Sequence, residues 1–258
     1  SPVLAGSLGM RSVAEFLAAA KHMGMQTGPA VSMHVHVNAV AKEQPGDVLS
    51  NKQIRNVWVH YSCFQLVINS MLQDSRVNTP AAMPLVFRRY QKIRVSKGKQ
   101  RAVYVLRSER HAPWSHRQTS VVQEFFAKMK RVSAQQNRHV LRKLNEFAER
   151  DDKPVGQTFQ KRNVRRYIAL VEQSSRRSSQ VNLQSLAAHG TLEFRAFPAT
   201  SDPERALRWV AFVLRLVEHF KDRDCDAYCK SWEDLEVRQQ HATLDMLEKD
   251  LQMNMTYW

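Results

Sequence analysis

The amino-acid sequence predicts an α+β fold, in which a small sheet with one polar face is backed by amphipathic helices. Residues 30–40 alternate between apolar and polar side chains, and the polar positions include Ser32, His34, His36 and Asn38. This period of two is typical of a strand. Residues 51–72 repeat their apolar positions at helical spacing and predict a long helix. Residues 181–186 and 191–197, separated by Ala187-Ala188-His189-Gly190, predict a β-hairpin.

Three further helices are predicted. The first spans residues 10–25, with Val13, Phe16, Leu17 and Ala20 at helical spacing and Gly24 near its end. The second begins with Asp202 as N-cap and Pro203 at its first helical position. Its predicted apolar face consists of Leu207, Val210, Leu214, Val217 and Phe220. The last runs from Trp232 to about Leu251.

The remaining segments are less regular. Residues 118–150 predict one or two charged helices, and residues 102–106 predict a short strand or a buried turn. Residues 75–84 and 176–179 are rich in turn-forming or small polar side chains and predict loops.

Composition narrows the class of protein. The chain has 258 residues, of which 43% are hydrophobic, and this is typical of a globular protein. No run of 18 apolar residues occurs, so we expect no membrane span, and the start of the chain shows no secretory leader. The three cysteines, Cys63, Cys225 and Cys229, favour a reducing intracellular compartment over a disulfide framework. Cys225 and Cys229 have no second pair with which to complete a metal site.

The charge is the most unusual property of the composition. The formal net charge is +15 and the isoelectric point is about 10.1. Such an excess favours a nucleic-acid or ribonucleoprotein partner, and the alternative is a basic compartment such as the mitochondrial matrix. The excess is also local. The predicted RNA-binding residues, which would contact phosphates without reading sequence, are Arg88, Arg89, Lys92, Arg94, Lys97, Lys99 and Arg101.

Two predicted strands carry side chains suited to chemistry. Strand period places His34, His36 and Asn38 on one face, about 7 Å between neighbours, where two imidazoles can bind a divalent metal or approach a phosphate. Glu193 and Arg195 share a face of the second hairpin strand with Thr191 and Phe197. A carboxylate and a guanidinium at this spacing can serve as metal ligand and anion clamp. The alternatives are a pair of ordinary histidines and a solvent-facing ion pair.

A third candidate follows the long helix. Ser75-Arg76-Val77-Asn78 offers a cation with hydroxyl and amide donors, which suits phosphate recognition. The alternative is an ordinary loop that ends the helix.

Taken in order, these segments resemble one family. They are the His-Val-His-Val segment, the helix ending in Ser-Arg-x-Asn, the stretch from Val181 to Leu186, Gly190-Thr191-Leu192-Glu193-Phe194-Arg195, and Phe197-Pro198-Ala199-Thr200 before a helix with Trp209. The family is that of the putative amidoligases, which are similar to glutamine synthetase and glutamate–cysteine ligase. The resemblance runs from Ser1 to about Phe220, and the Gly-Thr-Leu-Glu-Phe-Arg stretch is its most specific part.

The resemblance implies a fold and an activity. The fold is a curved antiparallel sheet, backed by helices, that holds ATP and divalent metal on its concave face. The activity is phosphorylation of a carboxylate by ATP, followed by attack of an amine on the acyl phosphate. We therefore expect an amidoligase-like domain over residues 1–222, with a basic insertion at about 86–160, and a C-terminal helical extension over residues 223–258.

The resemblance also implies residue roles. His34 and Glu193 would bind Mg²⁺ or Mn²⁺, and His36 would contact a phosphate. Arg195 would hold a phosphate or a substrate carboxylate, while Arg76, Asn78 and Asn38 would lie near the nucleotide. Glu193 and Arg195 would be the catalytic pair.

The sequence also departs from the family pattern. The family's Gly-x-Glu-x-Glu strand, which supplies acidic metal ligands, is expected upstream of Ser1 or is lost, so the N-terminal strands would be missing. One Glu and one His are too few to hold a hard divalent metal. Two functions therefore stay open. One is an ATP- and metal-dependent carboxylate–amine ligase. The other is a non-catalytic component of an RNA–protein assembly, such as a mitochondrial ribosome or its assembly intermediate.

Overall fold

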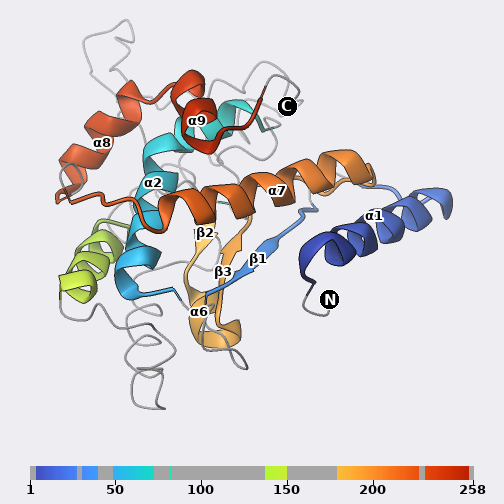
Figure 1. The fold of residues 1–258 in the computed structure, drawn as a ribbon, viewed down its shortest axis with the longest axis horizontal. Helices are drawn as coiled ribbons and strands as arrows, with labels where there is room; N and C mark the ends of the chain where they lie inside the picture. Colours follow the sequence, from blue (N-terminus) through green and yellow to red (C-terminus); the bar gives the residue numbers. More distant parts are fainter. Residues whose placement is uncertain are drawn as a thin grey trace, which may run out of the picture.

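The computed structural model describes residues 4–27, 31–39, 49–72, 82, 137–149, 179–226 and 230–255. Within these ranges the chain forms helices around one small sheet, which agrees with the predicted α+β class. Figure 1 shows the long helix α7 (Pro203–Phe220) running across the sheet, with α2 (Asn51–Ser70) beside it. No helix in these ranges has both the length and the apolar composition needed to span a membrane.

Among the described residues the sheet has three antiparallel strands in the order β1-β3-β2. These are β1 (Val35–Asn38), β2 (Val181–Asn182) and β3 (Thr191–Phe194). The central strand β3 pairs with both neighbours, and Phe194 lies opposite Val35 on one side and Val181 on the other. Directly opposite residues share a face of a sheet, so these three side chains form one apolar row. The alternation predicted for residues 30–40 is confirmed, although the regular strand occupies only its second half.

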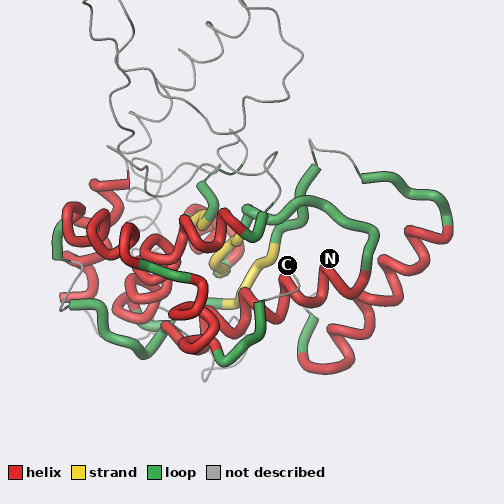
Figure 2. The backbone as a smooth tube through the Cα atoms, turned by 90° about the horizontal axis from the view of Figure 1, so that it is seen from above, coloured by secondary structure: helices red, strands yellow, loops and turns green. Residues whose placement is uncertain are grey.

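Helices cover the apolar face of the sheet (Figure 2). The ring of Tyr61 on α2 lies 5.8 Å from that of Phe194, and the ring of Phe197, just after β3, stacks at 4.8 Å on Trp209 of α7. All four side chains are almost completely buried. Burial of aromatic side chains of this size contributes strongly to stability, so α2 and α7 fix the sheet in place.

The two long helices begin where the sequence predicts. Ser50 and Gln53 form a capping box at the start of α2, and the Asp202 carboxylate accepts from the backbone N–H groups of Glu204 and Arg205 at the start of α7. The face predicted for α7 is partly wrong, because Leu214 is exposed and the helix buries Trp209 and Phe212 instead. The rings remove more apolar area from water than the leucine would, and this sets the rotation of the helix.

Two other predicted helices need correction. Helix α1 (Gly6–His22) begins and ends earlier than predicted, and Phe16 on its expected apolar face is exposed. The final helix is two helices, α8 (Trp232–His241) and α9 (Leu244–Leu251). The break occurs because Ala242 is extended and Thr243 caps α9 by accepting from the backbone N–H of Met246.

The predicted hairpin has the right strand pairing but the wrong connection. Residues expected to extend the first strand form the short helix α6 (Gln184–His189), which ends at Gly190 with φ of 70°. The Asn182 side chain accepts from the backbone N–H of Gln184 and so turns the chain out of the strand. Glycine suits the left-handed conformation that closes this helix.

The C-terminal helices belong to the same hydrophobic core. Helix α8 contacts α2, and α9 contacts both α7 and α2. Their buried side chains include Trp232, Leu235, Leu247 and Leu251. Residues 137–149 are also helical and add Val140, Leu141 and Leu144 to this core. The strand or turn predicted for residues 102–106 and the loop predicted for residues 75–84, apart from Ala82, lie outside the described residues.

Candidate functional site

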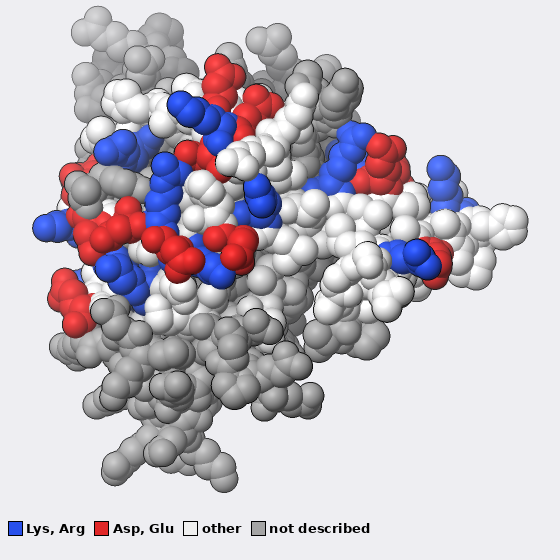
Figure 3. Space-filling view, in the orientation of Figure 1, with Lys and Arg blue, Asp and Glu red and all other residues white. Residues whose placement is uncertain are grey.

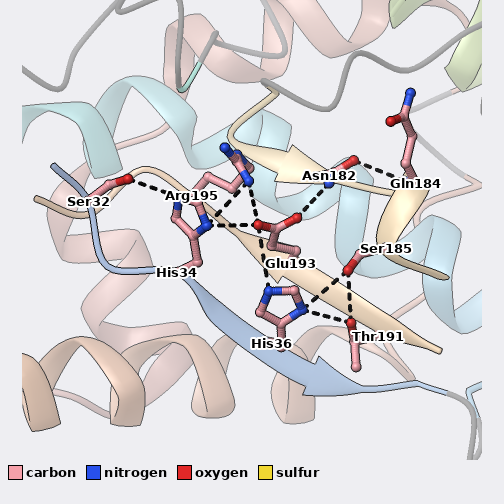
Figure 4. Close-up of polar contacts among 9 residues, drawn as sticks. All are labelled: Ser32, His34, His36, Asn182, Gln184, Ser185, Thr191, Glu193 and Arg195. Atoms are coloured by element: carbon pink, nitrogen blue, oxygen red, sulfur yellow. Dashed lines mark hydrogen bonds and ion pairs between the residues drawn. The ribbon is translucent and has the colours of Figure 1, made fainter. Parts of the chain in front are cut away.

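A row of polar side chains crosses the face of the sheet opposite the helices. Glu193 on the central strand lies opposite His36 of β1 and opposite Asn182 of β2. His34 and Arg195, which lie just beyond the regular ends of their strands, complete the group around Glu193 (Figure 4). Residues separated by more than 150 positions in the chain are thus brought together by strand pairing.

Glu193 is the centre of this group. Its Oε1 lies 2.5 Å from Nη1 of Arg195, 2.9 Å from Nδ1 of His34 and 3.6 Å from Nε2 of His36. Its Oε2 accepts a hydrogen bond of 2.5 Å from Nδ2 of Asn182. The residue is only 5% exposed. In this largely dry environment both carboxylate oxygens are hydrogen-bonded by protein groups, as buried polar atoms generally are.

These partners determine the charge of Glu193. Burial alone would raise the pKa of its carboxyl group, but hydrogen bonds from His34 and Asn182, with the charge and hydrogen bond of Arg195, outweigh burial and lower the pKa to about 2. The carboxylate is therefore ionised at any physiological pH. The alternative of a solvent-facing ion pair is wrong, since the pair with Arg195 is largely buried.

The contacts of His34 fix its orientation. Nδ1 faces the ionised Glu193, so it carries the hydrogen and donates to Oε1. Nε2 lies 2.9 Å from Oγ of Ser32, which donates to it when the imidazole is neutral. Ser32 is held in turn by a bridge between its backbone and that of Pro198.

His36 has a different environment. Its Nδ1 lies 2.9 Å from Oγ1 of Thr191 and 3.2 Å from Oγ of Ser185, and its ring meets that of His189 edge to face. Burial lowers the pKa of His36, and the attraction of Glu193 only partly offsets this effect. His36 is therefore neutral at pH 7.

Helix α6 supplies one side of this arrangement. Because Asn182 starts the turn into α6, Oγ of Ser185 lies 3.0 Å from Oγ1 of Thr191 at the start of β3. The sequence reasoning missed Asn182, Ser185 and Ser32 as members of the site. Asn182 had a local signal, because an Asn side chain can accept from the backbone N–H two residues further on and so turn the chain, although residues 181–186 were predicted as a strand.

The described residues do not fit a hard divalent metal. Among the described residues, Glu193 is the sole carboxylate of the group, and its two oxygens are held by Arg195, His34 and Asn182. The guanidinium also places a positive charge where a cation would bind. Within the described ranges, no group of three or more His, Cys, Asp or Glu residues could hold a metal ion. Mg²⁺ prefers several oxygen ligands, and this group offers too few.

The structure brings together four of the predicted site residues, His34, His36, Glu193 and Arg195. Asn38 is exposed at the far end of β1, opposite Thr191. Phe197, expected on the polar face, is buried against Trp209 instead. Arg76 and Asn78 lie outside the described residues, as do the predicted RNA-binding residues Arg88, Arg89, Lys92, Arg94, Lys97, Lys99 and Arg101.

A comparison with known protein families bears directly on β3, the strand that carries Glu193. The family model described as "Putative amidoligase enzyme" matches residues 116–217. This match confirms the resemblance to the amidoligase family over residues 116–217. It contains β2, α6, β3 and most of α7, and therefore Asn182, Glu193 and Arg195, whereas His34 and His36 on β1 lie outside it. No curated protein and no solved structure matches the chain.

Proposed function

We propose that the protein is an ATP-dependent carboxylate–amine ligase whose anion-binding site lies on the polar face of the sheet. The observation that carries this proposal is the convergence of Arg195, His34 and His36 on the buried carboxylate of Glu193, on a strand within the family match. A ligase of this class must bind a substrate carboxylate and the phosphates of ATP. In this proposal the three strands correspond to part of the curved sheet of glutamine synthetase-like ligases.

Each residue has a role in this proposal. Arg195 binds the substrate carboxylate or a phosphate, because a guanidinium presents a fork of N–H donors to such groups. Glu193 orients Arg195 and His34 rather than binding metal. The reaction transfers the terminal phosphoryl group of ATP to the carboxylate, and an amine then displaces phosphate. A divalent metal, which the family resemblance implies, would need oxygen ligands beyond the described residues.

Release of ADP in the presence of carboxylate and amine mixtures tests the proposal. Arg195→Lys keeps the charge but loses the fork, and we expect ADP release to fall at least about tenfold. The matched control is Arg208→Lys on α7, where an exposed arginine pairs with Glu204 four residues away. Calorimetry with ATP and Mg²⁺ provides the binding measurement. The proposal would be contradicted if the folded parent protein bound no ATP. It would also be contradicted if Arg195→Lys and Arg208→Lys released ADP at the same rate.

A second candidate function has its own observation. The described residues carry equal numbers of basic and acidic side chains, and Figure 3 shows the two kinds interspersed. The excess of +15 therefore comes from the rest of the sequence, chiefly residues 83–136 and 150–178. This concentration favours a component of an RNA–protein assembly, such as a mitochondrial ribosome or its assembly intermediate, in which an amidoligase-like framework holds a basic segment against phosphates.

RNA binding at increasing salt tests this second function. Each neutralised phosphate releases counterions, so the affinity of the parent protein should fall steeply with salt concentration. Replacement of Arg88, Arg89, Lys92 and Arg94 by Gln should flatten that slope. The control replaces Arg205, Arg208, Arg215 and Arg238 by Gln, which removes the same charge from described helices. Absence of binding at low salt would remove the main support for the RNA-bound function.

A further inference from the structure

Two hydroxyl groups converge on one ring nitrogen of His36. Nδ1 lies 2.9 Å from Oγ1 of Thr191 and 3.2 Å from Oγ of Ser185, and the two oxygens are 3.0 Å apart. Figure 4 shows the three side chains meeting between β1, the start of β3 and α6. A hydroxyl within hydrogen-bonding distance of an imidazole is the first requirement for an activated oxygen nucleophile.

The opposite nitrogen of the ring identifies the tautomer. Nε2 of His36 faces Oε1 of Glu193 at 3.6 Å. This distance exceeds a direct hydrogen bond, so the effect of the carboxylate is electrostatic. An Nε2–H is attracted to the negative charge, whereas a lone pair at Nε2 would be repelled. The neutral ring therefore presents its lone pair at Nδ1, where it accepts a proton from a hydroxyl group.

Burial distinguishes the two hydroxyl groups. Ser185 is 3% exposed, so its oxygen is closed to a substrate, while Thr191 is partly exposed at the start of its strand. Ser185 can donate to Thr191 while Thr191 donates to His36, which aligns the lone pairs of the threonine oxygen. Glu193 is fixed by Arg195 and Asn182 and orients the imidazole from the other side. Nucleophile, base and orienting carboxylate are thus three neighbouring groups.

We propose that Thr191 is a nucleophile for acyl transfer, with His36 as its base and with Glu193 and Ser185 as positioning residues. In the first step the Oγ1–H bond of Thr191 breaks and the proton passes to Nδ1 of His36. Oγ1 bonds to the acyl carbon of an activated ester, and the bond from that carbon to the leaving oxygen breaks. The leaving alkoxide or phenoxide takes the proton from His36, so the products are O-acylthreonine and a free alcohol or phenol.

The substrate class follows from the chemistry of this step. An activated ester carries its own leaving group, so acyl transfer to Thr191 needs neither ATP nor metal. The inference therefore goes beyond the ligase proposal, and its outcome can be separated from it. An ester probe tests Thr191 without nucleotide, whereas ADP release tests the ligase.

Acylation of the full-length protein by p-nitrophenyl acetate tests the inference. We expect release of p-nitrophenolate with an acetyl group on Thr191, located by peptide mass spectrometry. Thr191→Val, which keeps the shape, should abolish this adduct, and His36→Gln should slow it at least about a hundredfold. The internal control is the exposed Ser12 on α1, whose hydroxyl donates to the backbone carbonyl of Leu8 and which should stay unmodified.

Melting temperatures of both variants show whether they fold. An adduct on His36 or Ser185 instead of Thr191 would overturn the assignment. So would equal labelling of Thr191 and Ser12, labelling that His36→Gln leaves unchanged in a folded variant, or no labelling of the parent protein. A Thr191→Ser variant gives an independent arm. It should be acetylated at residue 191, because serine keeps the hydroxyl beside His36.

Discussion

The two faces of the sheet are stabilised by opposite means, although they share the same strands. On one face Leu192 and Phe194 are fully buried among the side chains of α2 and α7. On the other face Glu193 is also buried, but every contact that holds it is polar. The stabilisation from buried apolar side chains grows with the apolar area removed from water, and it changes little when one side chain replaces another of similar volume. A buried carboxylate depends instead on each partner, because loss of one leaves a charge without compensation.

This contrast has a functional consequence. The apolar face can change only by gain or loss of volume, so its variants act through stability. The polar face holds an ionised group whose partners also serve as anion-binding and proton-transfer groups in our proposals. Variants there should separate stability from activity, and the following experiments test that separation.

The largest effect on stability is expected on the apolar face. Phe194→Ala should lower the free energy of unfolding by about 3–5 kcal/mol, because it removes a ring at 0% exposure and leaves a cavity beside Tyr61. Denaturant unfolding measures this loss. The control is Phe16→Ala on α1, where the ring is 65% exposed and we expect a change within about 0.5 kcal/mol. Equal losses in both variants would contradict the assigned core.

Glu193→Gln should have the next largest effect. The amide keeps the shape but leaves Arg195 and His34 without an anionic partner, so we expect a loss of about 2–3 kcal/mol at pH 7. Glu204→Gln on α7 is the matched control, since it neutralises an exposed partner of Arg208 and should cost about 0.3–0.5 kcal/mol. A loss no greater than that of the control would show that the buried carboxylate gains no stabilisation from Arg195 and His34.

Low pH should remove the contribution of the ionised Glu193 carboxylate to the free energy of unfolding. The pKa of Glu193 is about 2 in the folded protein, below its ordinary value of 4.5, so its contribution is complete above pH 4.5 and is lost as the pH falls toward 2. The difference in unfolding free energy between the parent protein and Glu193→Gln should shrink by about 2 kcal/mol between about pH 6 and pH 3. A difference that is constant with pH would show that the carboxylate has no such stabilisation.

Arg195→Lys should show the smallest change in stability. Lysine retains a positive charge beside the buried Glu193 and loses only part of the hydrogen bonding, so the unfolding free energy should fall by about 1 kcal/mol. The tenfold or greater loss of ADP release expected for this variant would then not be explained by unfolding. If stability and activity fall together in Arg195→Lys, the arginine is structural and the two faces of the sheet do not differ in function.

Much of the fold could be predicted from local patterns. The start of α2, the capped start of α7 and the alternation around His34 and His36 depend on neighbouring residues alone, and the structure confirms them. The placement of Glu193 and Arg195 on one face also follows from strand period. The break between α8 and α9 was missed because only two extended residues, Ala242 and Thr243, interrupt an otherwise helical pattern.

Other features depend on contacts between distant segments. No local signal shows that Glu193 lies opposite both His36 and Asn182, because this depends on strand register. The rotation of α7 was likewise set by the fit of Trp209 against Phe197. The meeting of Thr191, Ser185 and His36 depends on α6, which replaced an expected strand once Asn182 turned the chain.

The sequence by itself determined which residues could form helices and strands, and which face of each strand is polar. These properties follow from side-chain size, backbone preference and the period of each element, all of which act over a few residues. Only the tertiary structure decided that Glu193 is buried, ionised and fully hydrogen-bonded. The physical reason is that desolvation and charge pairing of a carboxylate depend on the groups that folding brings within about 4 Å of it. For Glu193 these groups come from strands that are far apart in the chain.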